Sequence, residues 1–157
     1  MMDASTTYTR ALGVLARAPR SARDLRRRLL LKGEPEGAVD ATIERLTASG
    51  LLNDAAYARA FVRAKVSSQG FSRLRLQQEL VKRGVPREAA EEAIAEVFQD
   101  EDVDESANLE RVARKKLRAL RGLDEATQQR RLLGYLARRG YEVNQVRTVL
   151  RRLRPEG

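Results

Sequence analysis

The chain has 157 residues, a length that suits one domain or a short array of repeats. It contains neither cysteine nor histidine, which excludes disulfides, thiolate metal sites, and the commonest general base and zinc ligand. The formal net charge is +9, and the combination of 34% charged with only 4% aromatic residues favours helices with solvated faces over a large sandwich or barrel core.

No secretory or membrane signal stands out in the chain. The N-terminal segment lacks an apolar core of signal-peptide length, and no stretch approaches the roughly 20 apolar residues that cross a bilayer. We therefore expect a cytoplasmic protein without a membrane partner.

Residues 1–52 are expected to form a repeat of three helices. The first helix begins after an N-cap at Thr6 or Thr7. The second follows the N-cap Ser21 and ends at Gly33, because glycine lacks a Cβ and readily takes the left-handed conformation that ends helices. A third helix begins shortly after this glycine.

The same pattern recurs around Gly84 and Gly140. Leucines stand four and eight residues before each glycine, and aliphatic residues ten and thirteen after it, so each set lies on one helical face. These residues are Leu25, Leu29, Ile43 and Leu46, then Leu76, Leu80, Ile94 and Val97, then Leu132, Leu136, Leu150 and Leu153. A pattern kept in three copies indicates a repeat protein.

The second repeat spans residues 53–98. Asn53 or Asp54 is its expected first N-cap, and Ser72 caps its middle helix at the same distance from the glycine as Ser21 does in the first repeat.

The third repeat, at residues 106–157, departs from these caps. Its leading helix begins near Asp104, and Gln128 stands where the other repeats have serine. No segment shows sustained alternation of period two. The sequence therefore predicts an all-α fold of nine helices, in which three tandem three-helix repeats stack into an elongated, curved array.

An acidic linker is expected at residues 99–105, between the second and third repeats. Its carboxylates could hold a cation, but their order does not fit the calcium-loop pattern and the turn glycine is absent. Acids just before a helix also favour its macrodipole. We therefore expect a linker and helix cap, and no metal site.

The positive excess lies in the last third of the chain. Residues 108–157 carry the whole +9, whereas acids and bases balance over residues 1–107. A lopsided basic charge predicts an anionic partner, with nucleic acid first. The alternative is a solvated basic face without a partner.

The three middle helices are all basic, whereas the last helices of the first two repeats are acidic. A helix-turn-helix reader places its last helix against DNA phosphates, so only the third repeat suits that role. A stripe of basic middle helices would bind phosphates or acidic protein surfaces without reading sequence. Phe71, Tyr135 and Tyr141 could stack on bases, but packing is the expected role of each.

The basic side chains form a pool of candidate contacts to nucleic acid or to a protein filament. Its members are Arg26, Arg27, Arg73, Arg75, Arg114, Lys115, Lys116, Arg118, Arg130, Arg131, Arg138, Arg139, Arg147, Arg151 and Arg152.

No assembled chemistry is visible in the sequence. Phosphate-binding glycine motifs are absent, and the serines have no histidine partner for a triad. The carboxylates lie beside bases on helix faces, as solvated pairs do. We expect neither an enzyme nor a cofactor.

Several blocks resemble the RecX family. They are Ser21-Ala-Arg-Asp-Leu25-Arg-Arg-Arg-Leu29 with Lys32-Gly33, Gly50-Leu-Leu-Asn-Asp-Ala-Ala-Tyr57-Ala-Arg-Ala-Phe61-Val, Gly70-Phe-Ser-Arg73-Leu-Arg75, Glu79-Leu80, and Lys82-Arg-Gly84-Val85. The similarity covers roughly residues 7–153 and is strongest over 50–98. Asn53 stands where the family often has an acid.

This resemblance implies a bacterial regulator that binds the filament of the RecA recombinase on DNA and restrains its ATPase and strand-exchange activity in recombination and repair. It also implies stacked three-helix repeats and no catalytic residues. We expect a monomer whose partners are RecA and single-stranded DNA, with double-stranded DNA as a further candidate. The alternative is an autonomous, sequence-independent DNA-binding or architectural protein.

Overall fold

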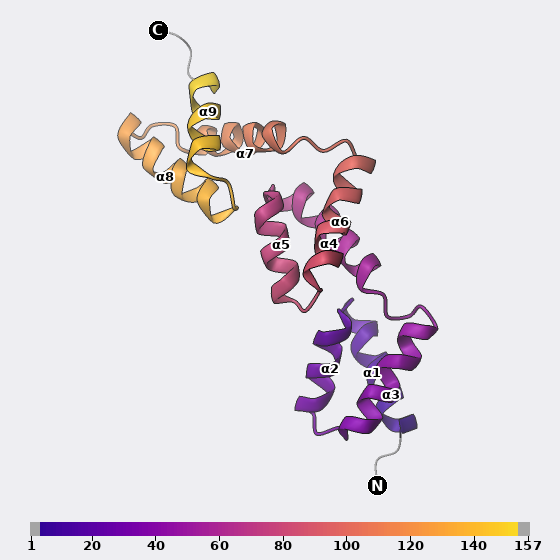
Figure 1. Cartoon of the computed structure of the whole chain (residues 1–157). Coiled ribbons are helices and arrows are strands. Elements are labelled where there is room, and N and C mark those ends of the chain that lie inside the picture. The colour runs from indigo at the N-terminus through magenta and orange to yellow at the C-terminus, as the bar shows by residue number, and fades with distance from the viewer. Residues whose placement is uncertain (1–3, 154–157) are drawn as a thin grey trace. The chain divides into compact units, whose positions relative to one another are not determined.

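A computed structural model describes residues 4–153, and over that range it contains nine α-helices and no strand (Figure 1). The helices are α1 (Ala4–Arg17), α2 (Ala22–Leu31), α3 (Glu36–Ala48), α4 (Asp54–Gln69), α5 (Arg73–Lys82), α6 (Arg87–Asp100), α7 (Glu105–Ala119), α8 (Glu125–Arg138) and α9 (Val143–Leu153). The predicted all-α fold of three-helix repeats is confirmed. Within the described range, no helix is both long and apolar enough to cross a membrane.

The chain folds as two compact units, each taken here by itself. One contains the residues up to Phe61 together with Glu79–Ala93, and the other contains Val62–Gln78 together with the residues from Ile94 onward. The helices α4, α5 and α6 are therefore each divided between the two units.

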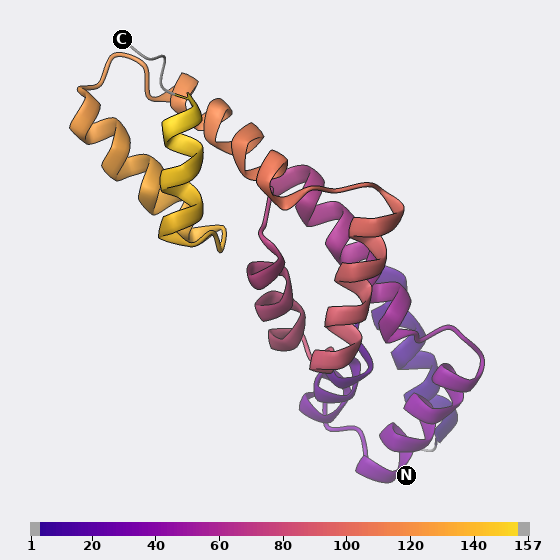
Figure 2. The ribbon, with the colours of Figure 1, turned by 45° about the horizontal axis from the view of Figure 1, so that its top comes forward.

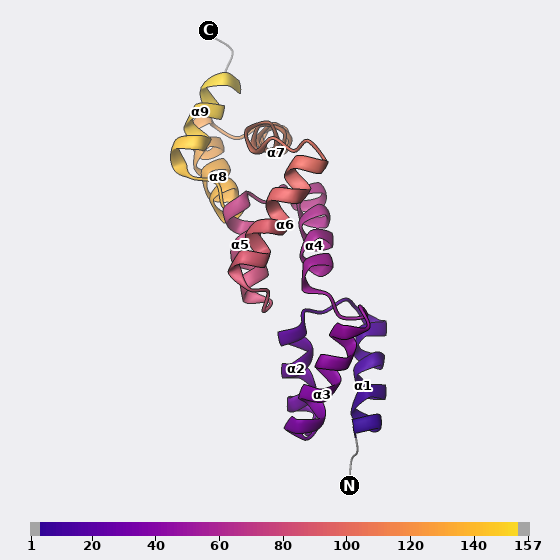
Figure 3. The same ribbon diagram turned by 45° about the vertical axis from the view of Figure 1, so that its right-hand side comes forward.

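The helices α1, α2 and α3 lie side by side around the core of the first unit (Figure 3). The predicted leucines Leu25, Leu29 and Leu46 are fully buried there, and Val39 joins them. The helical spacing of these side chains thus places one face of each helix against the others.

In the second unit, α8 and α9 lie side by side and both pack against α7 (Figure 2). Leu132 and Leu136 of α8 are fully buried against Leu109, Val146 and Val149. The two predicted leucines of the third repeat therefore form its core.

Each predicted turn glycine has a positive φ angle, 85° at Gly33, 94° at Gly84 and 92° at Gly140. The backbone hydrogen bonds around the three turns are equivalent: the residue after each glycine donates to the carbonyl four residues before the glycine, at 3.0–3.2 Å. This is the Schellman ending that a left-handed glycine permits. The helix phasing read from the sequence is confirmed at all three turns.

The serine caps are confirmed, but the expected cap of the first helix is wrong. Ser21 and Ser72 accept hydrogen bonds from the backbone N–H groups of Asp24 and Arg75. The helix α1 already begins at Ala4, so Thr6 and Thr7 lie inside it. The hydroxyl of Thr7 is buried, and it has a tertiary partner instead of a capping role.

Most of the acidic segment 99–105 belongs to a helix or contacts one. Its ends belong to α6 and α7, so the connection between the helices is only residues 101–104. Glu101 pairs with Arg63 at 2.9 Å, and Asp104 accepts hydrogen bonds from the first turn of α7. The described residues hold no cluster of acids, cysteines or histidines that could bind a metal ion.

Candidate functional site: basic surfaces and a groove beside α2

The helix α2 begins at a serine that also joins it to the turn after α5. The hydroxyl of Ser21 accepts from the N–H of Asp24 at 3.2 Å and donates to the carbonyl of Arg83 at 2.5 Å. A Cβ on Gly84 would lie 2.8 Å from the Cβ of Arg23. The turn can therefore approach α2 this closely only because residue 84 is glycine.

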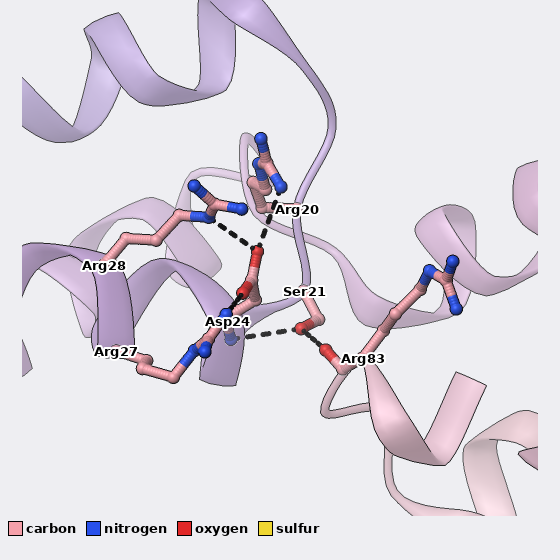
Figure 4. A network of polar contacts seen from close by, with 6 residues as sticks. All are labelled: Arg20, Ser21, Asp24, Arg27, Arg28 and Arg83. Carbon is pink, nitrogen blue, oxygen red and sulfur yellow. Dashed lines mark hydrogen bonds and ion pairs between the residues drawn. The ribbon is translucent and has the colours of Figure 1, made fainter. Parts of the chain in front are cut away.

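Asp24, in the first turn of α2, is the centre of a cluster of arginines (Figure 4). It accepts hydrogen bonds from Arg20 at 3.3 Å, Arg27 at 2.9 Å and Arg28 at 3.1 Å. Burial alone would raise the pKa of Asp24, but the hydrogen bonds from Arg27 and Arg28 outweigh it and hold the pKa below its ordinary value. Because one carboxylate pairs with three guanidinium groups, the cluster keeps a positive excess.

Beside this cluster lies a groove of about 740 Å³ between α2 and the C-terminal end of α5. Its cationic lining residues are Arg23, Arg26, Arg27, Lys82 and Arg83, and its one acid is Asp24. Asp40 and Glu36 of α3 pair with Arg26 at 2.8 and 3.1 Å. Arg83 pairs with Glu79, so Arg23, Arg27 and Lys82 carry the positive excess of the groove.

The groove also contains exposed aliphatic side chains. Leu31 is 78% exposed and Val81 is 44% exposed, and Leu30 beside them is partly buried. Arginines thus border an apolar patch. This combination is more typical of a surface that binds a partner than of one that contacts only water.

A second junction repeats the first one. The N–H of Ser72 donates to the carbonyl of Arg139 at 2.9 Å, and the guanidinium of Arg75 donates to the carbonyl of Arg138 at 2.6 Å. The guanidinium of Arg139 donates to the carbonyl of Gln69 at 3.0 Å. Two members of the predicted contact pool, Arg75 and Arg139, therefore bind backbone carbonyls within the protein.

The three aromatic candidates for base stacking pack against the protein. Phe71 and Tyr141 are buried, and Tyr135 packs against the core of α7, α8 and α9. The guanidinium of Arg139 lies 3.5 Å from the ring centroid of Tyr135, and the ammonium of Lys116 lies 4.6 Å from it. The expectation of packing roles agrees with this placement.

Tyr141 joins three segments of the second unit through its hydroxyl. The hydroxyl donates to the carbonyl of Gly70 at 2.7 Å and accepts from the amide of Asn108 at 3.1 Å. The carbonyl of the same amide accepts from Arg111 at 2.8 Å. Burial raises the pKa of Tyr141 to about 12, so the hydroxyl stays protonated over the physiological range.

Most pool members from the third repeat lie on its surface. Arg130, Arg131 and Arg138 of α8, Arg147, Arg151 and Arg152 of α9, and Lys115 and Arg118 of α7 are exposed. None of these eight forms an ion pair with another residue of the described range 4–153. They are the part of the pool with the most charge available to a partner.

Three of the remaining pool members are partly neutralised by nearby carboxylates. Arg27 is 66% exposed beside Asp24, Arg73 pairs with Glu105 at 3.6 Å, and Arg114 pairs with Glu110 at 2.8 Å. The arginine of each pair is more than half exposed, so a partner's anion can still reach it.

Of the residues that line the groove beside α2, the predicted pool contained Arg26 and Arg27 but not Arg23, Lys82, Arg83, Leu31 or Val81. A signal was present for Leu31, because at about 100° per residue it lies on the side of the helix opposite Leu25 and Leu29. The other residues gave no such signal, since the groove forms only when the turn after α5 meets α2.

Models of the three RecX three-helix domains match this chain in order. The first matches residues 8–46, the second 53–94 and the third 103–150. The chain is 39% identical to "Regulatory protein RecX" of Amycolatopsis mediterranei over 138 residues, which cover 88% of this chain and 77% of that protein. It is 37% identical to the protein of that name from Streptomyces coelicolor, over 93% of this chain and 77% of the relative.

A solved structure shows the same fold. The crystal structure of RecX from Lactobacillus salivarius superposes with a TM-score of 0.77 over 96% of both chains, at 21% sequence identity.

Proposed function

The chain belongs to the RecX family of regulatory proteins, and we propose that it binds the RecA–DNA filament and restrains RecA ATPase and strand exchange without chemistry of its own. It acts in this proposal as a cytoplasmic monomer. The inferences from composition and from family resemblance agree on a binding protein.

The exposed cations of α7, α8 and α9 are the observation that best supports this proposal. Eight of them lie on the surface without an ion pair in the described part of the chain. Cations placed in this way release counterions when they neutralise phosphates or carboxylates, which favours binding to a polyanion such as a nucleoprotein filament.

The test is the ATPase rate of RecA on single-stranded DNA as this protein is titrated in. We expect the rate to fall when the protein is present at far less than one copy per nucleotide, because a filament modulator acts on a polymer and not on each nucleotide. Inhibition that appears only when the DNA is coated would contradict the proposal.

Autonomous DNA binding is the second candidate, and the basic α9 favours it. Unlike the acidic α3 and α6, α9 carries exposed Arg147, Arg151 and Arg152 and could lie along phosphates. Fluorescence anisotropy on single-stranded and double-stranded DNA without RecA tests this role. Sequence-independent binding with no effect on RecA at low ratios would favour it over filament regulation.

A further inference from the structure

We propose that the groove beside α2 is a docking site for an acidic segment of a partner protein that carries aliphatic or aromatic side chains. This site lies in the first unit, and none of its lining residues belongs to the basic surface of α7, α8 and α9. It goes beyond the proposed function, because it would bind a peptide whether or not the third repeat binds DNA or a filament.

The charge of the groove calls for an anionic occupant. Arg23 and Lys82 are exposed and form no ion pair with any residue of the described range. Arg27 shares the carboxylate of Asp24 with Arg20 and Arg28, so it is only partly neutralised. Three cations from two helices therefore face solvent beside one carboxylate that is already shared.

The exposed apolar side chains of the groove favour a bound segment that also has apolar side chains. Leu31 and Val81 come from different helices and are 78% and 44% exposed. Both line the same groove as Arg27 and Lys82. A segment in which acids alternate with leucine or phenylalanine would satisfy the cations and cover the aliphatic groups together.

A protein segment fits this groove better than nucleic acid does. No aromatic side chain lines it, whereas single strands bind along stacking platforms as well as cations. A phosphate backbone would also place strongly hydrated groups over Leu31 and Val81 and leave their apolar surface without a partner.

Contacts within the protein hold both walls of the groove. The Ser21 hydroxyl holds the turn after α5 through the carbonyl of Arg83, and Gly84 allows the close approach to Arg23. Because these contacts fix both walls, an occupant would lose less free energy to ordering of the site.

The experiment compares two fluorescein-labelled peptides of equal length and charge. In one, glutamates alternate with leucine and phenylalanine, and in the other serines replace the apolar residues. We expect the apolar peptide to bind about tenfold more tightly by anisotropy, the factor that burial of one or two aliphatic side chains gives. Equal affinity for the two peptides would overturn the proposal.

Two variants locate the site. Leu31→Ser with Val81→Ser should remove the difference between the peptides, and Arg23→Ser with Arg27→Ser and Lys82→Ser should weaken both of them. The matched control is Arg147→Ser with Arg151→Ser and Arg152→Ser, which removes the same charge from α9 and should leave peptide binding unchanged. An equal loss in the control would show that net charge alone attracts the peptide, and would overturn the proposal.

An oligothymidylate serves as the competitor. If the groove is specific for protein, amide chemical shifts around Leu31 and Val81 should move with the apolar peptide and not with the oligonucleotide. Displacement of the peptide by the oligonucleotide with the same shifts would show a phosphate site and overturn the proposal. RecA inhibition is measured separately, so a negative result here leaves the proposed filament regulation standing.

Discussion

The carboxylate of Glu34 is buried directly after the first turn glycine, and two side chains of α1 satisfy it. The hydroxyl of Thr7 donates to it at 2.6 Å, and Arg10 forms an ion pair with it. The hydrogen bond from Thr7 is the main reason why the pKa of Glu34 lies below its ordinary value of 4.5, with Arg10 contributing as well.

This pKa shift predicts a stability that depends on acid pH. Because the folded pKa is lowered, the contribution of Glu34 is fully present above about pH 4.5 and is lost as the pH falls through the folded value. Urea unfolding at several pH values should show Glu34→Gln less stable than the native chain at pH 7, with a gap that narrows towards pH 3. A gap that does not change with pH would contradict this prediction.

Tyr141 provides a second prediction, through its buried hydroxyl. Tyr141→Phe leaves the carbonyl of Gly70 and the amide of Asn108 without this partner, so we expect a loss of about 1–3 kcal/mol in the free energy of unfolding. Tyr135→Phe is the matched control, because no hydrogen bond in the described region uses that hydroxyl. Equal losses in the two variants would show that the network contributes nothing specific.

At this scale, the sequence predicted caps that depend on local backbone and missed those side chains whose partners are distant. Ser21 and Ser72 bind N–H groups three residues away, so spacing was enough to find them. Thr7 is of a residue type that often caps helices, but its hydrogen-bond partner Glu34 is 27 residues away. This tertiary hydrogen bond outweighs the local preference of threonine for a capping position.

At the scale of elements, the three turn glycines share one backbone conformation but have different surroundings. No atom lies within 4 Å of a Cβ added at Gly33. At Gly84 such an atom would lie 2.8 Å from the Cβ of Arg23, and at Gly140 it would lie 2.6 Å from the Cβ of Arg75 and 3.0 Å from its backbone nitrogen. The second and third turns therefore end a helix and also pack against the start of another helix, α2 or α5. We call these two packed turns joints.

Alanine at these glycines should separate the two roles. Gly33→Ala should cost about 1 kcal/mol of unfolding free energy from the positive φ alone. Gly84→Ala and Gly140→Ala should each cost about 1–3 kcal/mol more, since a Cβ in a packed joint forces its neighbours apart. Chemical denaturation measures all three variants, and equal costs would mean that the joints yield without strain.

The sequence pattern predicted the helices but not these joints. The spacing of aliphatic residues around each glycine predicted the second and third helices of each repeat, and the N-cap candidates predicted the leading ones, because both signals are local. The departure at Gln128 had no explanation in the sequence. In the structure α8 begins earlier, after an N-cap at Asp124, and the amide of Gln128 donates to the carbonyls of Leu120 and Leu123.

At the scale of the whole molecule, the arrangement of the repeats stays a prediction from the sequence. An elongated, curved array should have a radius of gyration well above the value of about 15 Å for a globular chain of this length. Small-angle X-ray scattering measures it, and a value near 15 Å would contradict the predicted array.

The sequence also predicted where the charge lies, but not which charges are already in use. The pool of fifteen basic residues came from position alone. Arg75 and Arg139 bind backbone carbonyls, and Arg26 pairs with two acids of α3, whereas Arg130, Arg131 and Arg138 are exposed on α8. Such differences depend on tertiary partners that spacing does not reveal.

The exposed arginines of α8 lead to a prediction about salt dependence. Each cation that neutralises a phosphate steepens the fall of affinity with salt, and its removal lowers the slope by about one. Replacing Arg130, Arg131 and Arg138 together by alanine should weaken binding to the RecA–DNA filament at moderate salt and lower the slope by up to about three. Arg139 is left in place, because its removal would disturb the junction with Gln69.

The measurement is fluorescence anisotropy on labelled single-stranded DNA, with and without RecA, at several salt concentrations. A control variant with Arg17, Lys32 and Arg87 replaced by alanine has the same net charge, but its missing cations are exposed ones of the first two repeats. If the α8 surface contacts phosphates, the control keeps the native slope and the α8 variant does not. Equal slopes in both variants would show that the α8 arginines act only through net charge. Loss of binding to bare DNA with RecA inhibition intact would place the filament contact on other residues.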